Sequence, residues 1–219
     1  MNSFPRHTLF WVILFSAGFG FVESSVVVYL RAIYYPEGFQ FPLKPMSTQH
    51  FSVELLRETS TIVMLAAVAI LSGSKNWERF AWFLIAFGVW DIFYYIWLKV
   101  LVDWPVTLLD WDILFLVPLP WIGPVIAPVA ISMVMIVCGV WMIARLRNQR
   151  PFAPRLLSRI LASAGSAVVL FSFLYDTDAP LRNGLPRPYQ YSLLLVGLLH
   201  IILAFVLACR PSMKRSLHD

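Results

Sequence analysis

The sequence has few charged residues and few cysteines, and both shortages narrow the class of protein. Asp, Glu, Lys and Arg make up only 13% of the 219 residues, whereas hydrophobic residues make up 59%. No ordinary water-soluble domain of this length has such a composition, so we predict an integral membrane protein. The two cysteines, Cys138 and Cys209, lie in apolar stretches and form no CxxC pair. This excludes a disulfide framework and a cysteine-based redox or zinc centre.

The chain also lacks the motifs of the best-known small intramembrane enzymes. It has neither the Gly-x-Ser and paired His of rhomboid-like proteases nor the adjacent glutamates of CAAX-type proteases. It likewise lacks the three-His zinc pattern of ceramidase-like hydrolases and the CxxC of quinone-linked thiol oxidases. The net charge of +5 is not gathered into a basic stripe on a soluble module, so nucleic acid is not an expected partner.

Apolar windows of about 20 residues, the length that crosses the hydrocarbon of a bilayer, predict six helices. They fall at about 9–30, 51–73, 79–101, 121–144, 156–175 and 189–209. The first is interpreted as a span rather than a signal peptide, because apolar residues continue past Glu23 without a small-residue cleavage site. In the fifth, Ala162, Gly165 and Ser166 predict close packing on a neighbouring helix. Residues 1–219 are therefore expected to form one all-α, six-helix transmembrane domain.

The basic residues divide unequally between the two sides of the membrane. With six spans, 11 of the 17 Lys and Arg residues fall with the two termini and with the connections near residues 75 and 150. By the positive-inside rule, both termini are predicted to be cytoplasmic in a multi-pass protein of the plasma (inner) membrane. The Arg-rich connection near residue 150 is interpreted as an orientation signal that touches anionic lipid headgroups.

The start of the second span carries ionisable side chains on one face. At an advance of about 100° per residue, His50, Glu54, Arg57, Glu58 and Thr61 share a face about 100° wide. Each ionisable group inside a span costs roughly 2.5 to 3.5 kcal/mol on insertion scales, so such groups face the bundle interior and mark a function or an obligatory pair. The second span runs inwards, so this polar face is expected in its outer half.

Ionisable residues on other spans fall at a similar depth. At a rise of about 1.5 Å per residue, Glu23, Glu58, Asp91 and His200 are predicted to lie roughly 10 to 16 Å below the outer ends of their helices. Tyr95 flanks Asp91 and is expected to donate a hydrogen bond to a carboxylate. We therefore expect four helices to contribute to one outward-facing polar cavity.

Two interpretations of this polar layer remain open. In one, Arg57 forms a buried ion pair with Glu23, Glu54 or Asp91 that only fixes helix register. The other is a functional site, because one arginine cannot neutralise all of these acids. Its candidate catalytic residues are Glu23, Glu54, Glu58 and Asp91. Its candidate substrate-binding residues are His50, Arg57, Tyr95, Asp110 and Asp112.

A divalent metal ion is one candidate ligand for the carboxylates that Arg57 cannot neutralise. Its candidate ligands are Glu23, Glu58, Asp91 and His200. The Glu-x-x-His repeat of di-iron bundles is missing, and the nearest spacing is that from His50 to Glu54. Haem is disfavoured, because His50 lies at the outer boundary and His200 lies roughly 16 Å deeper.

Residues 101–129, LVDWPVTLLDWDILFLVPLPWIGPVIAPV, form an unusual connection. Its aspartates alternate with tryptophans, which favours an interfacial or partly re-entrant segment over the cavity mouth, and a simple belt of anchoring Trp is the alternative. Pro120, Pro124 and Pro128 recur every four residues. They predict a kinked or broken start to the fourth span.

Three functions fit these features. The first is an enzyme or binding protein for a lipid or other amphiphile, with Glu54, Glu58 or Asp91 as general acid or base and Arg57 binding a phosphate or carboxylate. The second is a proton- or cation-coupled transporter, although no polar pathway continues through the cytoplasmic half. The third is a non-catalytic subunit or assembly factor whose partner is another membrane protein or a second copy. The one-sided polar pocket favours an enzyme or binding protein over a channel.

Overall fold

The computed structural model describes residues 4–39, 43–116, 119–150, 152–178 and 184–209. It is mostly helical, and six helices are long and apolar enough to cross a membrane. They are α1 (Arg6–Tyr34), α2 (Thr48–Ser72), α3 (Asn76–Val102), α4 (Ile126–Arg147), α5 (Leu156–Leu174) and α7 (Tyr191–Ala208). The shortest has 18 residues, which is about 27 Å of helix against a hydrocarbon thickness of about 30 Å. The prediction of six helices that are long and apolar enough to cross a membrane is confirmed.

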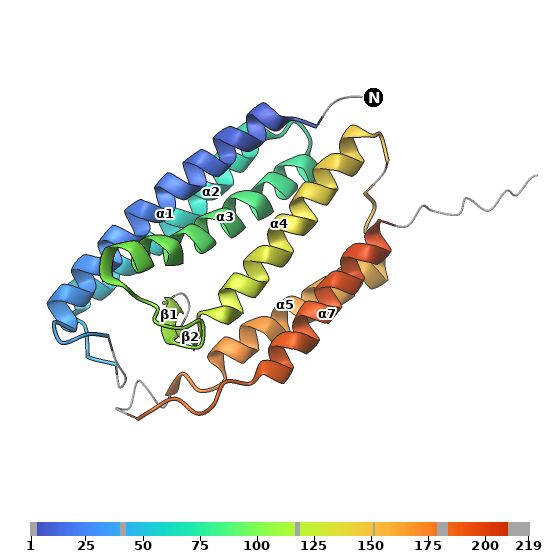
Figure 1. The fold of residues 1–219 in the computed structure, drawn as a ribbon. Helices are drawn as coiled ribbons and strands as arrows, with labels where there is room; N and C mark the ends of the chain where they lie inside the picture. Colours follow the sequence, from blue (N-terminus) through green and yellow to red (C-terminus); the bar gives the residue numbers. More distant parts are fainter. Residues whose placement is uncertain (1–3, 40–42, 117–118, 151, 179–183, 210–219) are drawn as a thin grey trace, which may run out of the picture.

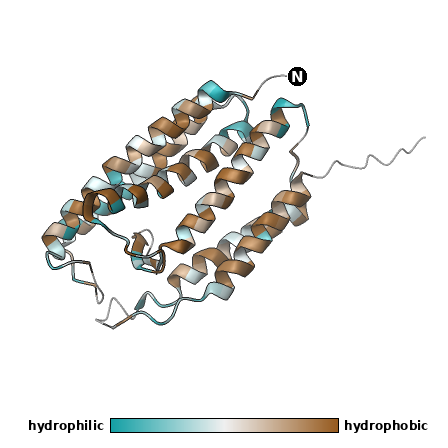
Figure 2. Ribbon diagram, in the orientation of Figure 1, coloured by the Kyte–Doolittle hydropathy of each residue, from teal (hydrophilic) through white to brown (hydrophobic). Residues whose placement is uncertain are grey.

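Helix α3 lies at the centre of the first four helices, and α1, α2 and α4 pack around it (Figure 1). It completely buries the side chains of Trp82, Ile85 and Leu98. The helices are coloured mainly hydrophobic along their lengths (Figure 2), and many large apolar side chains are exposed on their outer faces. An apolar outer surface over a packed interior is what a lipid-facing bundle requires.

Glycines let the helices approach one another closely. A Cβ atom at Gly20 of α1 would lie 3.0 Å from a backbone oxygen of α3, and one at Gly88 of α3 would lie 2.7 Å from the backbone oxygen of Ser132 on α4. Helices α5 and α7 meet in the same way, because a Cβ at Gly165 would lie 2.7 Å from the backbone oxygen of Gly197. The predicted close packing of the fifth span is confirmed at Gly165, whereas Ser166 is exposed.

An antiparallel hairpin connects α3 to α4. Its strands are β1 (Trp111–Phe115) and β2 (Trp121–Pro124), and Asp112 lies opposite Gly123. The prediction of an all-α chain is therefore wrong at this connection. A short apolar run does not distinguish a strand from a buried helix, so hydropathy alone assigns Trp121–Pro124 to the fourth span.

The fourth span is a continuous helix that begins at Ile126, so the predicted broken start is also wrong. Pro120 and Pro124 precede the helix, and Pro128 lies in its first turn, where a missing N–H group removes no intrahelical hydrogen bond. The N–H groups of Val125 and Ile126 donate to the backbone carbonyl groups of Asp110 and Leu108, which precede β1, at 2.9 and 2.8 Å. The connection from α3 to α4 thus supplies acceptors for N–H groups at the start of α4.

The connections gather at two ends of the bundle. The hairpin, the segment after α1 and the segment before α7 lie at one end, and the start of α1 lies at the opposite end with the α2–α3 turn (Figure 1). This arrangement agrees with six spans that alternate in direction. The polar residues predicted for the outer half of the second span lie toward the hairpin end.

Candidate functional site

A cavity of about 410 Å³ lies between α1, α2, α3, the hairpin and the segment that follows α1. Its volume falls within the range of about 300 to 1,000 Å³ that is usual for small-molecule sites. Its charged lining residues are Glu23, Arg31, Lys44, Glu54, Arg57, Glu58, Asp91 and Asp112. Its aromatic lining residues are Tyr34, Tyr35, Phe39, Phe51, Trp90, Tyr94 and Tyr95. The cavity therefore combines many charges with a largely apolar and aromatic wall.

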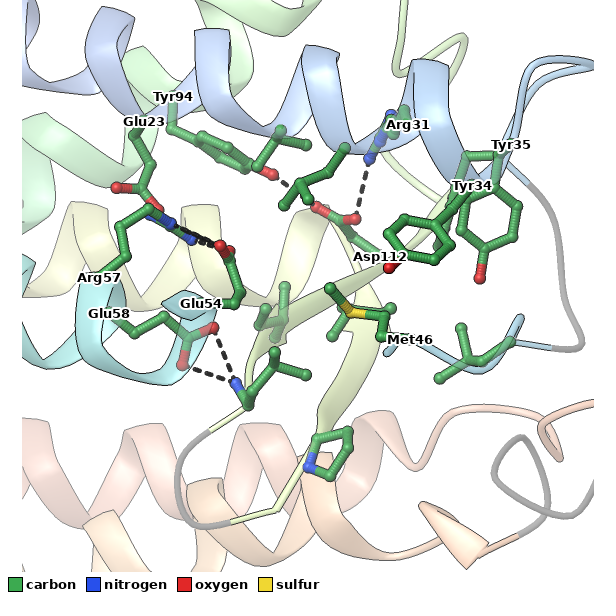
Figure 3. Close-up of a pocket in the computed structure, with 18 of the residues that line it drawn as sticks. Glu23, Arg31, Tyr34, Tyr35, Met46, Glu54, Arg57, Glu58, Tyr94 and Asp112 are labelled. Carbon is green, nitrogen blue, oxygen red and sulfur yellow. Dashed lines mark hydrogen bonds and ion pairs between the residues drawn. The ribbon is translucent and has the colours of Figure 1, made fainter. Parts of the chain in front are cut away.

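Arg57 lies between two carboxylates from different helices (Figure 3). Its Nε atom donates to the Glu54 carboxylate at 2.9 and 3.0 Å, and its terminal nitrogens donate to Glu54 and to Glu23 of α1. Thr61 Oγ1 also donates to Glu23, at 3.2 Å. The spacing of three residues from Glu54 to Arg57 places the two side chains on one helix face. Arg57 therefore pairs with both Glu23 and Glu54, and these ion pairs connect α1 to α2.

Glu58 follows one turn after Glu54 and has a different environment. Its side chain is buried, with 5% of the residue exposed, and both carboxylate oxygens accept the backbone N–H of Leu116 at 2.9 Å. This contact joins α2 to the segment after β1, as Figure 3 shows. Among the described residues, Glu58 has no ion-pair partner.

Asp91 of α3 is buried in a similar way. Only 8% of the residue is exposed, and its carboxylate accepts a hydrogen bond from Ser132 Oγ on α4 at 2.8 Å. Its only hydrogen-bond partner within the described part of the chain is therefore neutral. Tyr95, expected to donate a hydrogen bond to a carboxylate, lines the cavity but makes no such bond among the described residues. Its ring contacts those of Tyr94 and Trp104.

A second ion pair joins α1 to the hairpin. Arg31 Nη2 lies 3.0 Å from Asp112 Oδ1, and the guanidinium stacks over the rings of Trp104 and Phe39 at 3.8 and 4.7 Å from their centroids. Tyr94 donates to the other carboxylate oxygen at 3.4 Å. Burial raises the pKa of the Asp112 carboxyl above its ordinary value, and Arg31 opposes this shift.

Sequence reasoning missed Arg31 as a member of the site, because it was assigned to the loop beyond the first span. The helix continues to Tyr34, and Glu23, Val27, Leu30, Arg31 and Tyr34 all line the cavity. Their spacings of three, four and one residues mark one helical face, so extending the first helix by one turn would have revealed them.

Three predicted members of the site lie outside this cavity. His50 is exposed in the first turn of α2, where its Nδ1 atom lies 2.6 Å from the hydroxyl of Tyr34 at the cavity edge. Asp110 accepts hydrogen bonds from Val106 and Thr107 in the turn before β1. Burial acts to raise the pKa of Asp110, but these bonds outweigh it and lower that pKa.

His200 is the third of these residues. It lies on α7, and its Nδ1 atom is 2.7 Å from the backbone oxygen of Val196. Helix α7 packs against α5, and α4 separates that pair from α1, α2 and α3 (Figure 1). The expectation of a polar layer from four helices is corrected to three helices and the hairpin, because hydropathy gives the depth of a residue but not the order of the helices.

The candidate metal ligands are not gathered into one group. Within the described ranges, no three His, Cys, Asp or Glu side chains are placed together so that they could hold a metal ion. Glu23 is paired with Arg57, Glu58 is bonded to the backbone of the hairpin segment, and Asp91 is bonded to α4. The four proposed ligands thus lie in separate local networks.

The six spans and the charges buried between them define a class, that of multi-pass membrane proteins with a charged interior. Comparison with models of protein families, with curated proteins and with solved structures finds no match to this chain. Any functional conclusion therefore rests on the chemistry of the cavity.

Proposed function

We propose that this protein binds a lipid or another amphiphile in the cavity, as a binding protein or as an enzyme that acts on it. The observation that carries the proposal is the lining itself. Carboxylates from α1, α2, α3 and β1 share one cavity with apolar residues such as Leu30, Met46 and Ile113. A polar headgroup would lie against the carboxylates, and an apolar chain would lie along the apolar wall.

Within an enzyme, Glu58 and Asp91 are the proposed general acids or bases. Both are buried, and both are bonded to neutral donors that leave the carboxylate without a fixed countercharge. Glu54 and Glu23 are better suited to holding Arg57 in place. A phosphate or carboxylate ligand at Arg57 would compete with two carboxylates, so we do not assign Arg57 to ligand binding.

We also propose that the cavity faces the outer side of a plasma (inner) membrane, with the termini in the cytoplasm. The basic residues that cluster at the opposite end of the bundle support this orientation. Membrane lipids would then reach the cavity from the outer leaflet.

The alternative of a non-catalytic subunit or assembly factor has one specific support. The ion pairs of Arg57 and Arg31 connect α1 to α2 and to the hairpin, as a purely structural network would. Under this alternative, Glu58→Gln would lower the yield of folded protein or of a complex with a partner membrane protein or second copy. Under the amphiphile proposal, the variant folds and still admits the amphiphile, but it loses activity or the preference for one headgroup.

Photolabelling of the full-length protein in lipid nanodiscs tests the proposal. The probe is a long-chain alcohol that carries a diazirine near the hydroxyl end. We expect labelled peptides from the cavity walls, and we expect Ile113→Trp, which fills the cavity, to remove that labelling. The matched control is Leu56→Trp, because Leu56 is 68% exposed on the outer face of α2.

Labelling confined to outer surfaces, or cavity labelling that survives Ile113→Trp, would reject the proposal. Size-exclusion chromatography of both tryptophan variants separates blocked binding from misfolding.

A further inference from the structure

Carboxylates outnumber fixed positive charges in the cavity. Five carboxylates line it, together with two arginines and Lys44. Arg57 is occupied by Glu23 and Glu54, and Arg31 is occupied by Asp112. Lys44 is exposed at the mouth, where its ammonium lies 5.4 Å from the centroid of the Tyr35 ring.

The two remaining carboxylates have neutral partners only. Glu58 accepts a backbone N–H, and Asp91 accepts a hydroxyl group, within the part of the chain that the structure describes. Each carboxylate has further acceptor sites, and a buried carboxylate is costly unless a positive charge or additional donors compensate it. A ligand that enters the cavity is in a position to supply that compensation.

The aromatic walls favour the same sign of charge. Trp90, Tyr94 and Tyr95 line the cavity with Glu58 and Asp91, and the face of an aromatic ring attracts a cation. At the mouth the protein already places its own cations on such rings, because Arg31 lies over Trp104 and Phe39, and Lys44 lies near Tyr35.

The wall also has an unused donor. The indole N–H of Trp90 is buried and finds no acceptor among the described residues, although the residue is only 4% exposed and lines the cavity. Buried donors of this kind normally have a partner. This second observation, independent of the acids, shows that the polar groups of the wall are not all satisfied among the described residues.

We infer that the cavity selects an amphiphile whose headgroup is positively charged, as a protonated amine or a quaternary ammonium, over neutral and anionic headgroups. The inference rests on the proposed function and adds the class of ligand. The headgroup lies between Glu58 and Asp91 against the aromatic wall, and the apolar chain extends toward the apolar lining.

Competition in nanodiscs tests this selectivity, and the bilayer lipid carries an uncharged sugar headgroup so that it supplies no ammonium group of its own. The full-length protein is labelled with the photoreactive long-chain alcohol, and octadecyltrimethylammonium, octadecanol and octadecyl phosphate compete at equal measured mole fractions in the membrane. We expect octadecyltrimethylammonium to displace the probe at a mole fraction at least about tenfold lower than the mole fraction that octadecanol or octadecyl phosphate requires.

The variants Glu58→Gln and Asp91→Asn identify the source of the preference. Each keeps a carbonyl oxygen that accepts the bond from Leu116 or Ser132, and each should reduce the preference severalfold. The matched control is Asp103→Asn, because the Asp103 side chain is 90% exposed and Asn also favours the left-handed backbone found there. The control should keep the full preference.

Three different results would each overturn either the proposed function or the inference about charge. If no competitor displaces the probe and the cavity is not labelled, the proposed function itself fails. If the cavity binds all three competitors equally, or prefers the phosphate, the function stands and the charge inference is overturned. A preference for the ammonium compound that survives in both carboxylate variants also overturns it, because the selectivity would then have another origin.

Discussion

At the scale of single residues, Arg57 connects two helices of the cavity through ion pairs. It is partly buried, and it pairs with carboxylates from two helices. Moving ions out of water costs several kcal/mol each, so a buried pair adds little net stability as a whole. Removal of one member is far more damaging, because it leaves the others uncompensated.

We therefore expect Arg57→Gln to lower the free energy of unfolding by about 3 to 5 kcal/mol, which corresponds to a fall of roughly 6 to 20 °C in the melting temperature. Thermal unfolding of the purified variants measures this change. The matched control is Arg187→Gln, whose parent side chain is 72% exposed and lies 3.8 Å from Asp176. Exposed pairs contribute about 0 to 1 kcal/mol, so the control should melt close to the unaltered protein.

Combining Arg57→Gln with Glu23→Gln and Glu54→Gln provides the decisive comparison. If the loss in the single variant comes from uncompensated carboxylates, the triple variant recovers much of the stability. A triple variant less stable than Arg57→Gln would contradict this explanation.

Arg31 combines an ion pair with aromatic stacking, and lysine cannot reproduce both. Arg31→Lys keeps the charge opposite Asp112 but loses the planar stack on Trp104 and Phe39. We expect the melting temperature to fall by an amount equivalent to about 0.5 to 2 kcal/mol. Arg187→Lys serves as the exposed control. An unchanged melting temperature in Arg31→Lys would mean that the charge alone secures this contact.

At the scale of elements, the hydrophobic spans could be predicted and the hairpin could not. A run of about 20 apolar residues has one stable form in a bilayer, since only a helix satisfies its backbone internally. The residues of β1 and β2 form runs of five and four, which fit a strand or a helix equally well. Their antiparallel pairing decided the structure. The prolines that suggested a broken helix lie before α4 or in its first turn.

Close helix packing gives a prediction with a built-in control. Gly165→Ala places a methyl group 2.7 Å from a backbone oxygen of α7, so α5 and α7 must separate, at a cost of about 1 to 3 kcal/mol. Gly18→Ala meets nothing within 4 Å, and the higher helix propensity of alanine should leave stability unchanged or slightly raised. Thermal unfolding compares the two variants. Equal melting temperatures would show that the α5–α7 contact accommodates a methyl group at Gly165 and is looser than a 2.7 Å approach implies.

At the scale of the whole molecule, the site was partly predictable because some of it is local. The spacing of Glu54, Arg57 and Glu58 placed them on one helix face, and the structure finds all three at the cavity. The contacts of Asp91 with Ser132 and of Arg31 with Asp112 depend on the order in which helices and hairpin pack. No periodic pattern in a single segment specifies that order, and the same limitation misplaced His200.

The orientation of the whole bundle gives the last prediction. In a background with alanine in place of both native cysteines, single cysteines are placed at exposed positions on opposite ends. Glu37→Cys and Asp103→Cys lie at the cavity end, and Lys75→Cys and Asn148→Cys lie at the other end. Labelling of intact cells with a membrane-impermeant maleimide reports which end is outside.

The excess of basic residues near Lys75 and Asn148 predicts that these two cysteines are protected in intact cells and are labelled only after the membrane is opened. Glu37→Cys and Asp103→Cys should be labelled directly. The reverse pattern would place the cavity in the cytoplasmic leaflet, where its ligand would have to come from that leaflet. Labelling at one position from each end would contradict the six-span arrangement itself, because it requires both ends of a span to face the same side. The orientation therefore decides which pool of amphiphiles can reach Glu58 and Asp91, independently of whether the cavity prefers a cationic headgroup.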